Sequence, residues 1–235
     1  MVSGNWLRSS IGRKALMAAS GLVLVGFVIM HLLGNLLIYR GPDAINAYAK
    51  KLRDLGPMLW VARAGLLLAL IVHVVASIQL SIESRRARPV RYQKLRSAET
   101  TLAARTMLLS GVLVLAYLIY HLLHFTFHVA HPVLTRVTDD TGHISVYAMV
   151  ILSFREWPIS LAYIAGMACV CLHLSHGIAS SFQTLGLTTE RTLPVLSWFG
   201  RLFAFVVFLG YISIPLAVLL GFIGRDLLVT YTRWP

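Results

Sequence analysis

The stretch SGVLVLAYLIYHLLHFTFH, residues 110–128, has no Asp, Glu, Lys or Arg and is long enough to cross a bilayer as a helix, which takes about 20 apolar residues. It nevertheless contains His121, His124 and His128, which helical spacing places along one stripe. A histidine inside a bilayer is costly and tends to mark a function. A metal cage, a proton path and a haem ligand are the functions that such a stripe suggests.

The composition of the whole chain indicates a membrane protein. Of the 235 residues, 57% are hydrophobic and 13% are charged, whereas a soluble domain carries about 25% charged residues. The formal net charge of +12 does not indicate nucleic-acid binding, because the basic residues lie in short segments between apolar runs, without interleaved aromatic rings. We therefore expect an all-α integral membrane protein with a single membrane domain over residues 1–235.

Five runs are long and apolar enough to form transmembrane helices. They cover about 15–39, 58–82, 104–128, 157–183 and 199–222. The first four contain histidines and are expected to form a bundle, and the fifth has none. The longest segment between runs, 129–156, is predicted to be a loop with one surface helix.

The distribution of basic residues predicts the orientation in the membrane. The N-terminal segment MVSGNWLRSSIGRK and the loop 83–100 are rich in Lys and Arg, and such segments stay in the cytoplasm. The first apolar run is too long for a signal peptide, so we expect an uncleaved first span. The N-terminus would then be cytoplasmic and the C-terminus external. Lys50, Lys51 and Arg53, in an outer loop, weaken this prediction without reversing it.

An internal echo relates the first and third spans. SGLVLVGFVIMHLL (20–33) and SGVLVLAYLIYHLL (110–123) share Ser-Gly, a spacer of nine residues, and His-Leu-Leu. On a helix this spacing returns each serine almost to the face of its histidine, about 16 Å away along the axis. The glycines beside that face would let a bulky group approach the backbone.

The predicted topology places the histidines at two depths. At 1.5 Å per residue, His31 and His121 lie about 25 Å from the inner boundary of the membrane, and His73 and His173 about 15 Å from it. Such pairs suit two bis-histidine haems held between facing helices, which transfer electrons because no open iron position remains. Two alternatives remain: hydrogen bonds between helices, and a proton relay in a transporter.

Other polar residues fall near one of the two levels. His124 and His128 would line the outer side of the upper haem, near its propionates or a quinone, or they are interface residues like those of an aromatic belt. A zinc site completed by His131 and His143 is a third possibility. The remaining residues expected around the haems are Arg13, Ser20, Arg105, Ser110, His176 and Gln183. The serines could instead bond back to helix carbonyls.

Three longer motifs carry a resemblance to a known family. They are HLLGNLLIYRGPDAINAY (31–48), RTMLLSGVLVLAYLIYHLLHFTF (105–127) and HLSHGIASSFQTLGL (173–187). With these motifs the chain resembles, over most of its length, the di-haem cytochrome b membrane-anchor subunit of type B succinate:quinone oxidoreductases and fumarate reductases, the succinate dehydrogenase cytochrome b558 family.

The resemblance implies a function, partners and ligands. Members anchor a flavoprotein and an iron–sulfur protein on the bacterial inner (cytoplasmic) membrane and exchange electrons with a quinone, commonly menaquinone. By motif position, His31 and His121 would bind the outer, distal haem b, and His73 and His173 the inner, proximal haem b. The chain would be the membrane subunit of an oxidoreductase, and the succinate chemistry would belong to its partners.

Quinone chemistry near the outer haem needs a proton acceptor on the outer side. Asp54, directly before the second span, is the first candidate, followed by His124 and His128; the alternative for Asp54 is an ordinary helix-start acid. Some fumarate-reducing members carry a glutamate two residues before the fourth ligand, where this chain has Cys171, and the difference favours succinate oxidation. The alternative function is a di-haem anchor of another quinone-linked enzyme, such as a hydrogenase or a fumarate reductase.

Overall fold

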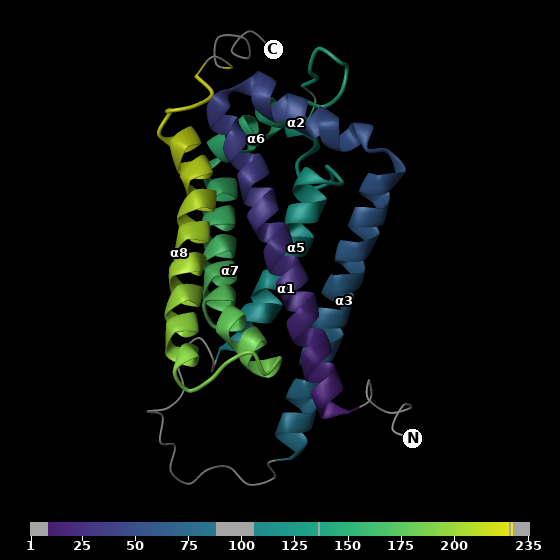
Figure 1. Ribbon diagram of the computed structural model, residues 1–235. Helices are drawn as coiled ribbons and strands as arrows, with labels where there is room; N and C mark the ends of the chain where they lie inside the picture. Colours follow the sequence, from purple (N-terminus) through teal and green to yellow (C-terminus); the bar gives the residue numbers. More distant parts are fainter. Residues whose placement is uncertain (1–8, 88–105, 136, 226, 228–235) are drawn as a thin grey trace.

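Five long helices form the body of the protein (Figure 1). The computed structural model describes residues 9–87, 106–135, 137–225 and 227. Within these residues the long helices are α1 (Ser10–Asn35), α3 (Pro57–Arg86), α5 (Met107–Phe125), α7 (Trp157–Thr184) and α8 (Thr192–Leu219). Each is long and apolar enough to cross a membrane, so the predicted all-α, multi-pass membrane fold is confirmed.

The ends of the spans differ from the predicted ones. A 3₁₀ segment, η2 (Leu36–Arg40), follows α1 directly and carries the first span to Arg40. α5 ends at Phe125 rather than at 128, and residues 104 and 105 lie outside the described part of the chain. α8 starts at Thr192 instead of 199, because its first turn accepts a proline and polar side chains that an apolar-run criterion leaves out.

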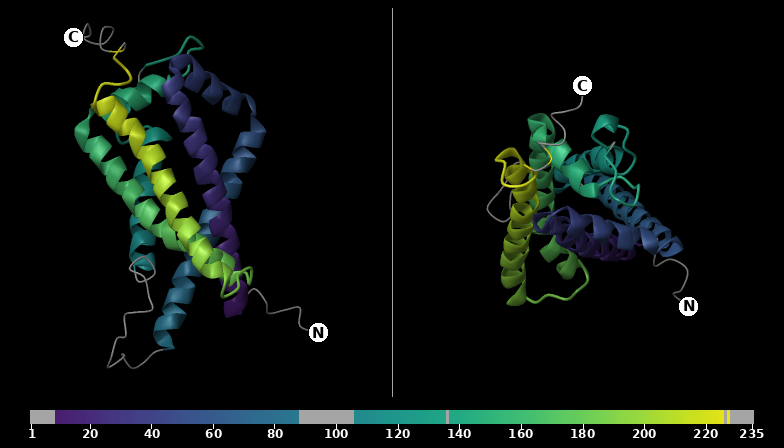
Figure 2. Two further views of the ribbon diagram at one scale, coloured as in Figure 1. Left: turned by 60° about the vertical axis from the view of Figure 1, so that its left-hand side comes forward. Right: turned by 90° about the horizontal axis from the view of Figure 1, so that it is seen from above.

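Two shorter helices lie across one end of the bundle, called here the upper end (top of Figure 1, and Figure 2 from above). α2 (Pro42–Asp54) connects the first two spans, and α6 (Val146–Arg155) follows the short η4 (Pro132–Thr135). The prediction of a surface helix in 129–156 is wrong, because most of α6 is buried against α2, α7 and α8. A mostly apolar helix of ten residues is too short to span a bilayer but suits a core position.

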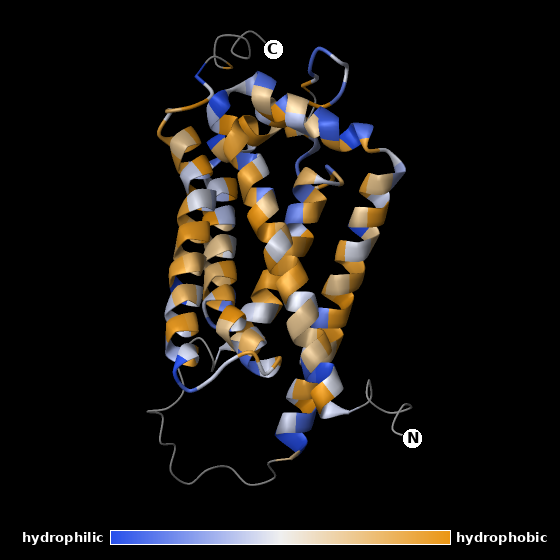
Figure 3. Cartoon of the chain, in the orientation of Figure 1, coloured by the Kyte–Doolittle hydropathy of each residue, from blue (hydrophilic) through white to orange (hydrophobic). Residues whose placement is uncertain are grey.

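The surface of the long helices is apolar, as lipid contact requires. Hydrophobic residues run along them, and hydrophilic residues gather toward the ends and on α2 (Figure 3). In α3, only Ala76 is buried, while Trp60, Leu68 and Ile71 are among the exposed side chains. Such a helix would be unstable in water, and a bilayer supplies its missing apolar surroundings.

Helix packing brings the four histidine-bearing helices together. α3 packs on α1, α5 packs on α7, and α1 also contacts α7. α8 lies along α7 and touches α1 (Figure 2). The predicted bundle of the first four spans is therefore present, with the fifth span packed alongside it.

Candidate functional site

The upper pair of histidines joins α1 and α5. His31 and His121 each lie one turn before the end of their helix, and their ring centroids are 5.9 Å apart with the planes at 82°. Phe27 stacks on His31 with the centroids 5.2 Å apart, and Tyr211 of α8 lies 6.2 Å from it. The hydroxyl of Tyr211 donates to the carbonyl of Val28, which fixes α8 beside this pair.

The lower pair joins α3 and α7. The ring centroids of His73 and His173 are 6.2 Å apart, with the planes at 77°. Both residues lie in the half of their helix that is nearer the lower end. The structure thus brings together the same two pairs that the sequence depths predict; ligation of iron by these histidines stays a prediction.

The separations within the pairs suit one metal ion each. A metal–nitrogen bond is about 2 Å long, and an imidazole centroid lies about 1 Å beyond its nitrogen, so two axial imidazoles have centroids about 6 Å apart. Both measured separations, 5.9 and 6.2 Å, match this value. Two axial imidazoles with a macrocycle around the iron make a six-coordinate haem, so the donor set fits haem b.

The lower histidines are held in the tautomer that a metal ligand needs. Nδ1 of His73 lies 3.0 Å from the carbonyl oxygen of Met17, and a carbonyl only accepts, so Nδ1 carries the proton. Ser110 donates its hydroxyl to the carbonyl of Met107 at 3.1 Å and therefore accepts from Nδ1 of His173 at 3.2 Å. Both rings are left with a free lone pair on Nε2, as in metal sites where the other nitrogen is anchored.

The Ser-Gly halves of the sequence echo lie against the lower histidines. A Cβ added at Gly21 would be 3.1 Å from Cε1 of His73, and one at Gly111 would be 3.4 Å from Cε1 of His173. The anchoring residues Met17 and Met107 each stand three residues before the Ser-Gly, so the echo is longer than the sequence analysis recognised. The extended pattern, Met-x-x-Ser-Gly, would have pointed to them.

His124 lies in a buried hydrogen-bonded cluster above His121. Its Nδ1 is 3.0 Å from the hydroxyl of Tyr163 and its Nε2 is 3.1 Å from the hydroxyl of Ser153, and none of the ring is exposed. The hydroxyl of Tyr163 is also 3.4 Å from Nδ1 of His121. His124 therefore has no free nitrogen for iron, whereas Nε2 of His121 has no hydrogen-bond partner among the described residues.

Tyr163 and Ser153 were not predicted from the sequence, because both come from helices distant from α5 in sequence and match no spacing. α6, which carries Ser153, was expected at the surface.

The predicted residues around the lower level have varied surroundings. Arg13 pairs with Glu83 through a 2.7 Å contact and lines a cleft of about 250 Å³ between α1 and α3. Ser20 donates back to the carbonyls of Leu16 and Met17, which is the structural alternative foreseen for it. The remaining predicted residues are Gln183, exposed in the last turn of α7, His176, half-buried below His173, and Arg105, which lies outside the described residues.

The predicted outer-side residues do not converge on one point. Nε2 of His128 is 3.1 Å from the carbonyl of Phe125, in a left-handed turn (φ 56°) that ends α5. Asp54, the last residue of α2, accepts from Lys50 at 2.7 Å on the exposed surface. For zinc, no group of three or more His, Cys, Asp or Glu side chains comes together among the described residues.

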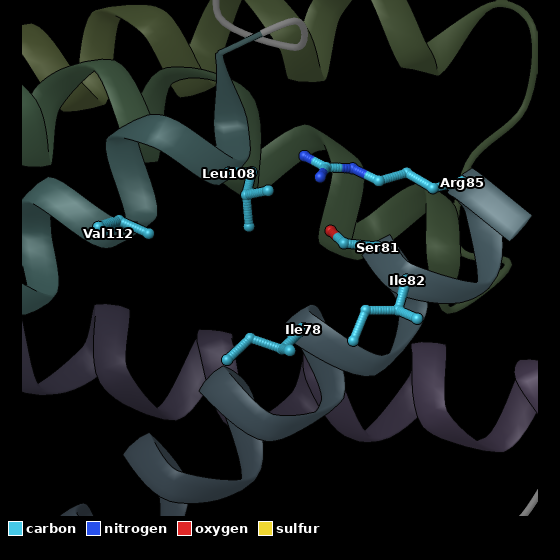
Figure 4. Close-up of a pocket in the computed structure, with 6 residues that line it drawn as sticks. All are labelled: Ile78, Ser81, Ile82, Arg85, Leu108 and Val112. Carbon is cyan, nitrogen blue, oxygen red and sulfur yellow. The ribbon is translucent and has the colours of Figure 1, made fainter.

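A cleft of about 280 Å³ opens between α3 and α5 near the lower pair (Figure 4). Its walls are apolar, and Ser81 and Arg85 from α3 lie at one end. Val112, on the opposite wall, directly follows Gly111, the neighbour of His173. The lining includes neither His73 nor His173, so the cleft lies beside the lower pair and not between its rings.

These features define a multi-pass, all-α membrane protein whose bundle holds two histidine pairs at two levels. Comparisons of the chain with protein-family models, with curated proteins and with solved structures found no match.

Proposed function

We propose that this protein is the membrane anchor and electron-transfer subunit of a succinate:quinone oxidoreductase, with two b haems between the succinate-oxidising partners and a quinone. One observation carries the proposal: two histidine pairs, stacked along the bundle, each have the spacing of axial ligands to one metal ion. Hydrogen bonds between helices would not require four imidazoles at two matched levels.

The chain's own residues would bind and orient the two groups. His73 and His173 would hold the lower haem and His31 and His121 the upper one, with Met17 and Ser110 fixing the lower ring tautomers. A bis-histidine haem supplies one-electron transfer without an open ligand position. Arg85, beside the apolar cleft at Ile78 and Leu108, would pair with the propionates of the lower group.

Partner subunits would supply the other redox groups. An iron–sulfur cluster needs about four thiolates, and the chain has two cysteines, so the clusters would reside in an iron–sulfur subunit. The motif resemblance supports a flavoprotein subunit as the second partner. The motif resemblance supports succinate as the electron donor, menaquinone as the quinone and the bacterial cytoplasmic membrane as the location. The basic N-terminal segment supports a cytoplasmic N-terminus.

Purification of the native complex through a tag on this chain tests the proposal. We expect a flavoprotein and an iron–sulfur protein to copurify, and succinate to reduce b haem in the purified material. A complex whose haems are reduced by hydrogen and not by succinate would instead indicate a hydrogenase anchor. Protein without a reduced-minus-oxidised b-type spectrum would contradict the proposal and favour a transporter.

A further inference from the structure

The upper and lower pairs are anchored differently. In the lower pair, His73 donates to the backbone carbonyl of Met17. His173 donates to the hydroxyl of Ser110, which itself donates to a backbone carbonyl of its own helix. In the upper pair, the only described partner of a ring nitrogen is the Tyr163 hydroxyl, 3.4 Å from Nδ1 of His121. Tyr163 is 5% exposed and lies on α7, a helix that contributes no histidine to this pair.

Tyr163 belongs to a series of buried polar groups connected by hydrogen bonds. Its hydroxyl is 3.0 Å from Nδ1 of His124, and Nε2 of His124 is 3.1 Å from Ser153, which is fully buried. Buried polar groups in an apolar medium need partners, so such a series persists only when each member is satisfied. This series of hydrogen bonds connects α5, α7 and α6 and reaches the upper end of the bundle at Ser153.

If His121 were to bind a metal through Nε2, the direction of each hydrogen bond in this series of polar groups would follow. The neutral ring then carries its proton on Nδ1 and donates to Tyr163. The phenol, having accepted, donates to Nδ1 of His124, and His124 in turn donates from Nε2 to Ser153. In the opposite direction Tyr163 would donate to His121, whose proton would then occupy Nε2 and block the metal.

We propose that Tyr163 is a positioning residue for the upper haem: it orients His121 through Nδ1, selects its metal-binding tautomer and lowers the midpoint potential of that haem alone. This inference rests on the proposed function. A hydroxyl that donates onward is a stronger acceptor, because successive hydrogen bonds polarise one another. A stronger acceptor on Nδ1 makes the imidazole more basic, which stabilises ferric over ferrous iron.

Redox titration of the intact complex with Tyr163→Phe tests this role. We expect two haems, with the midpoint potential of the upper haem shifted upward and that of the lower haem unchanged; loss of the upper haem alone would also support the proposal. The upper haem is identified as the signal missing from His121→Leu. Unchanged potentials, or equal shifts of both haems, would overturn the proposal.

Tyr117→Phe is the matched control. The Tyr117 ring lies 6.2 Å from His121 and 5.5 Å from Tyr163, but its hydroxyl has no hydrogen bond to a described residue. This variant should leave both potentials in place. An upward shift as large as that of Tyr163→Phe would show that loss of any nearby hydroxyl suffices, and would overturn the proposal.

A second measurement applies if Tyr163→Phe does not accumulate. In wild-type complex with its haems reduced to the diamagnetic ferrous state, nitrogen NMR of labelled histidine should show His124 protonated at Nε2, with the signal assigned by its loss in His124→Phe. Protonation of His124 at Nδ1 would contradict the proposed direction of the hydrogen bonds from His121 to Ser153. Wild-type complex without haem would contradict the proposed function itself. That result differs from the two that would contradict only the role of Tyr163, namely unselective potentials in Tyr163→Phe and His124 protonated at Nδ1.

Discussion

The difference between His121 and His124, one turn apart on α5, depends on their hydrogen bonds. Both are histidines in an apolar helix, and composition cannot distinguish them. Both nitrogens of His124 have hydroxyl partners, from Tyr163 and Ser153, and its ring stacks on Phe125 with centroids 4.1 Å apart. His121 faces His31 instead and keeps Nε2 free. Whether each histidine keeps a free ring nitrogen therefore depends on neighbours on other helices.

Substitution at these two positions should have different effects. His121→Leu should remove the upper haem and leave His73 and His173 able to hold the lower one, so that succinate still reduces the remaining haem while transfer to quinone largely fails. His124→Leu should retain both haems, with at most a shifted midpoint potential or quinone affinity. The number of haems per protein chain, taken from the pyridine haemochrome spectrum, distinguishes the two variants. If His124→Leu lost the upper haem and His121→Leu kept it, the assignment would be contradicted.

Asp139, in the loop before α6, offers a prediction on pH. The hydroxyl of Thr141 donates to its carboxylate at 2.5 Å and lowers its pKa below 3.8, helped by backbone amides and by Arg53. A lowered folded-state pKa means that the carboxylate stabilises this turn above the ordinary value and that the contribution is lost as the pH falls through the folded pKa.

The amide of Thr141 reports on this turn, because it donates to Asp139 at 2.9 Å. The part of its NMR shift that follows the carboxylate should move in the acid range, with a midpoint below the ordinary carboxyl value. Asp139→Asn should abolish that movement. A midpoint above the ordinary carboxyl value would show that the turn does not stabilise the charge.

At the scale of elements, apolar length predicted which segments span the membrane but not where the two shorter helices, α2 and α6, lie. α1, α3, α5, α7 and α8 were evident because 20 or so apolar residues have few other uses. α2 was missed since its residues are mostly polar, and α6 was placed at the surface although its side chains pack inward. The depth of each histidine along its helix was predictable from residue counts. Contacts between helices depend on the rotation of each helix about its axis, which residue counts do not provide.

Close approach of α1 to His73 gives a test at this scale. In Gly21→Val, the added side chain would meet the His73 ring, with its Cβ 3.1 Å from Cε1, and should displace the ring from the Met17 carbonyl. We expect the lower haem to be lost and the upper one retained. Gly26→Val, on the same helix with nothing within 4 Å of its Cβ, is the control and should keep both. Two normal haems in Gly21→Val would show that this contact does not position His73.

At the scale of the whole molecule, the bundle is built from two similar halves. α1 pairs its histidine with that of α5, and α3 with that of α7. The halves are α1 with α3 and α5 with α7, and in each the glycine of the Ser-Gly on the first helix lies against the histidine of the second. The sequence echo in the first and third spans and the matched depths of His73 and His173 predicted this relation in part; the contacts of the two glycines with the lower histidines became evident only from the structure.

The orientation of the bundle is a whole-molecule prediction. With five spans, the start of α1 and the end of α8 lie at opposite ends. The excess of Lys and Arg in the N-terminal segment and in the loop 83–100 predicts that the lower end faces the cytoplasm. A reporter fused after Pro235 should therefore read as external, and one inserted near Arg88 as cytoplasmic. The opposite pattern would exchange the proximal and distal haems.

The haem content of the intact complex tests the central claim most directly. Two pairs of histidines, with ring centroids 5.9 and 6.2 Å apart, predict two haems b for each copy of this chain in the pyridine haemochrome assay. His31→Leu and His121→Leu should each leave one haem, and the double variant should also leave one, because both residues serve the same group. One haem, or none, in the intact wild-type complex would contradict the account.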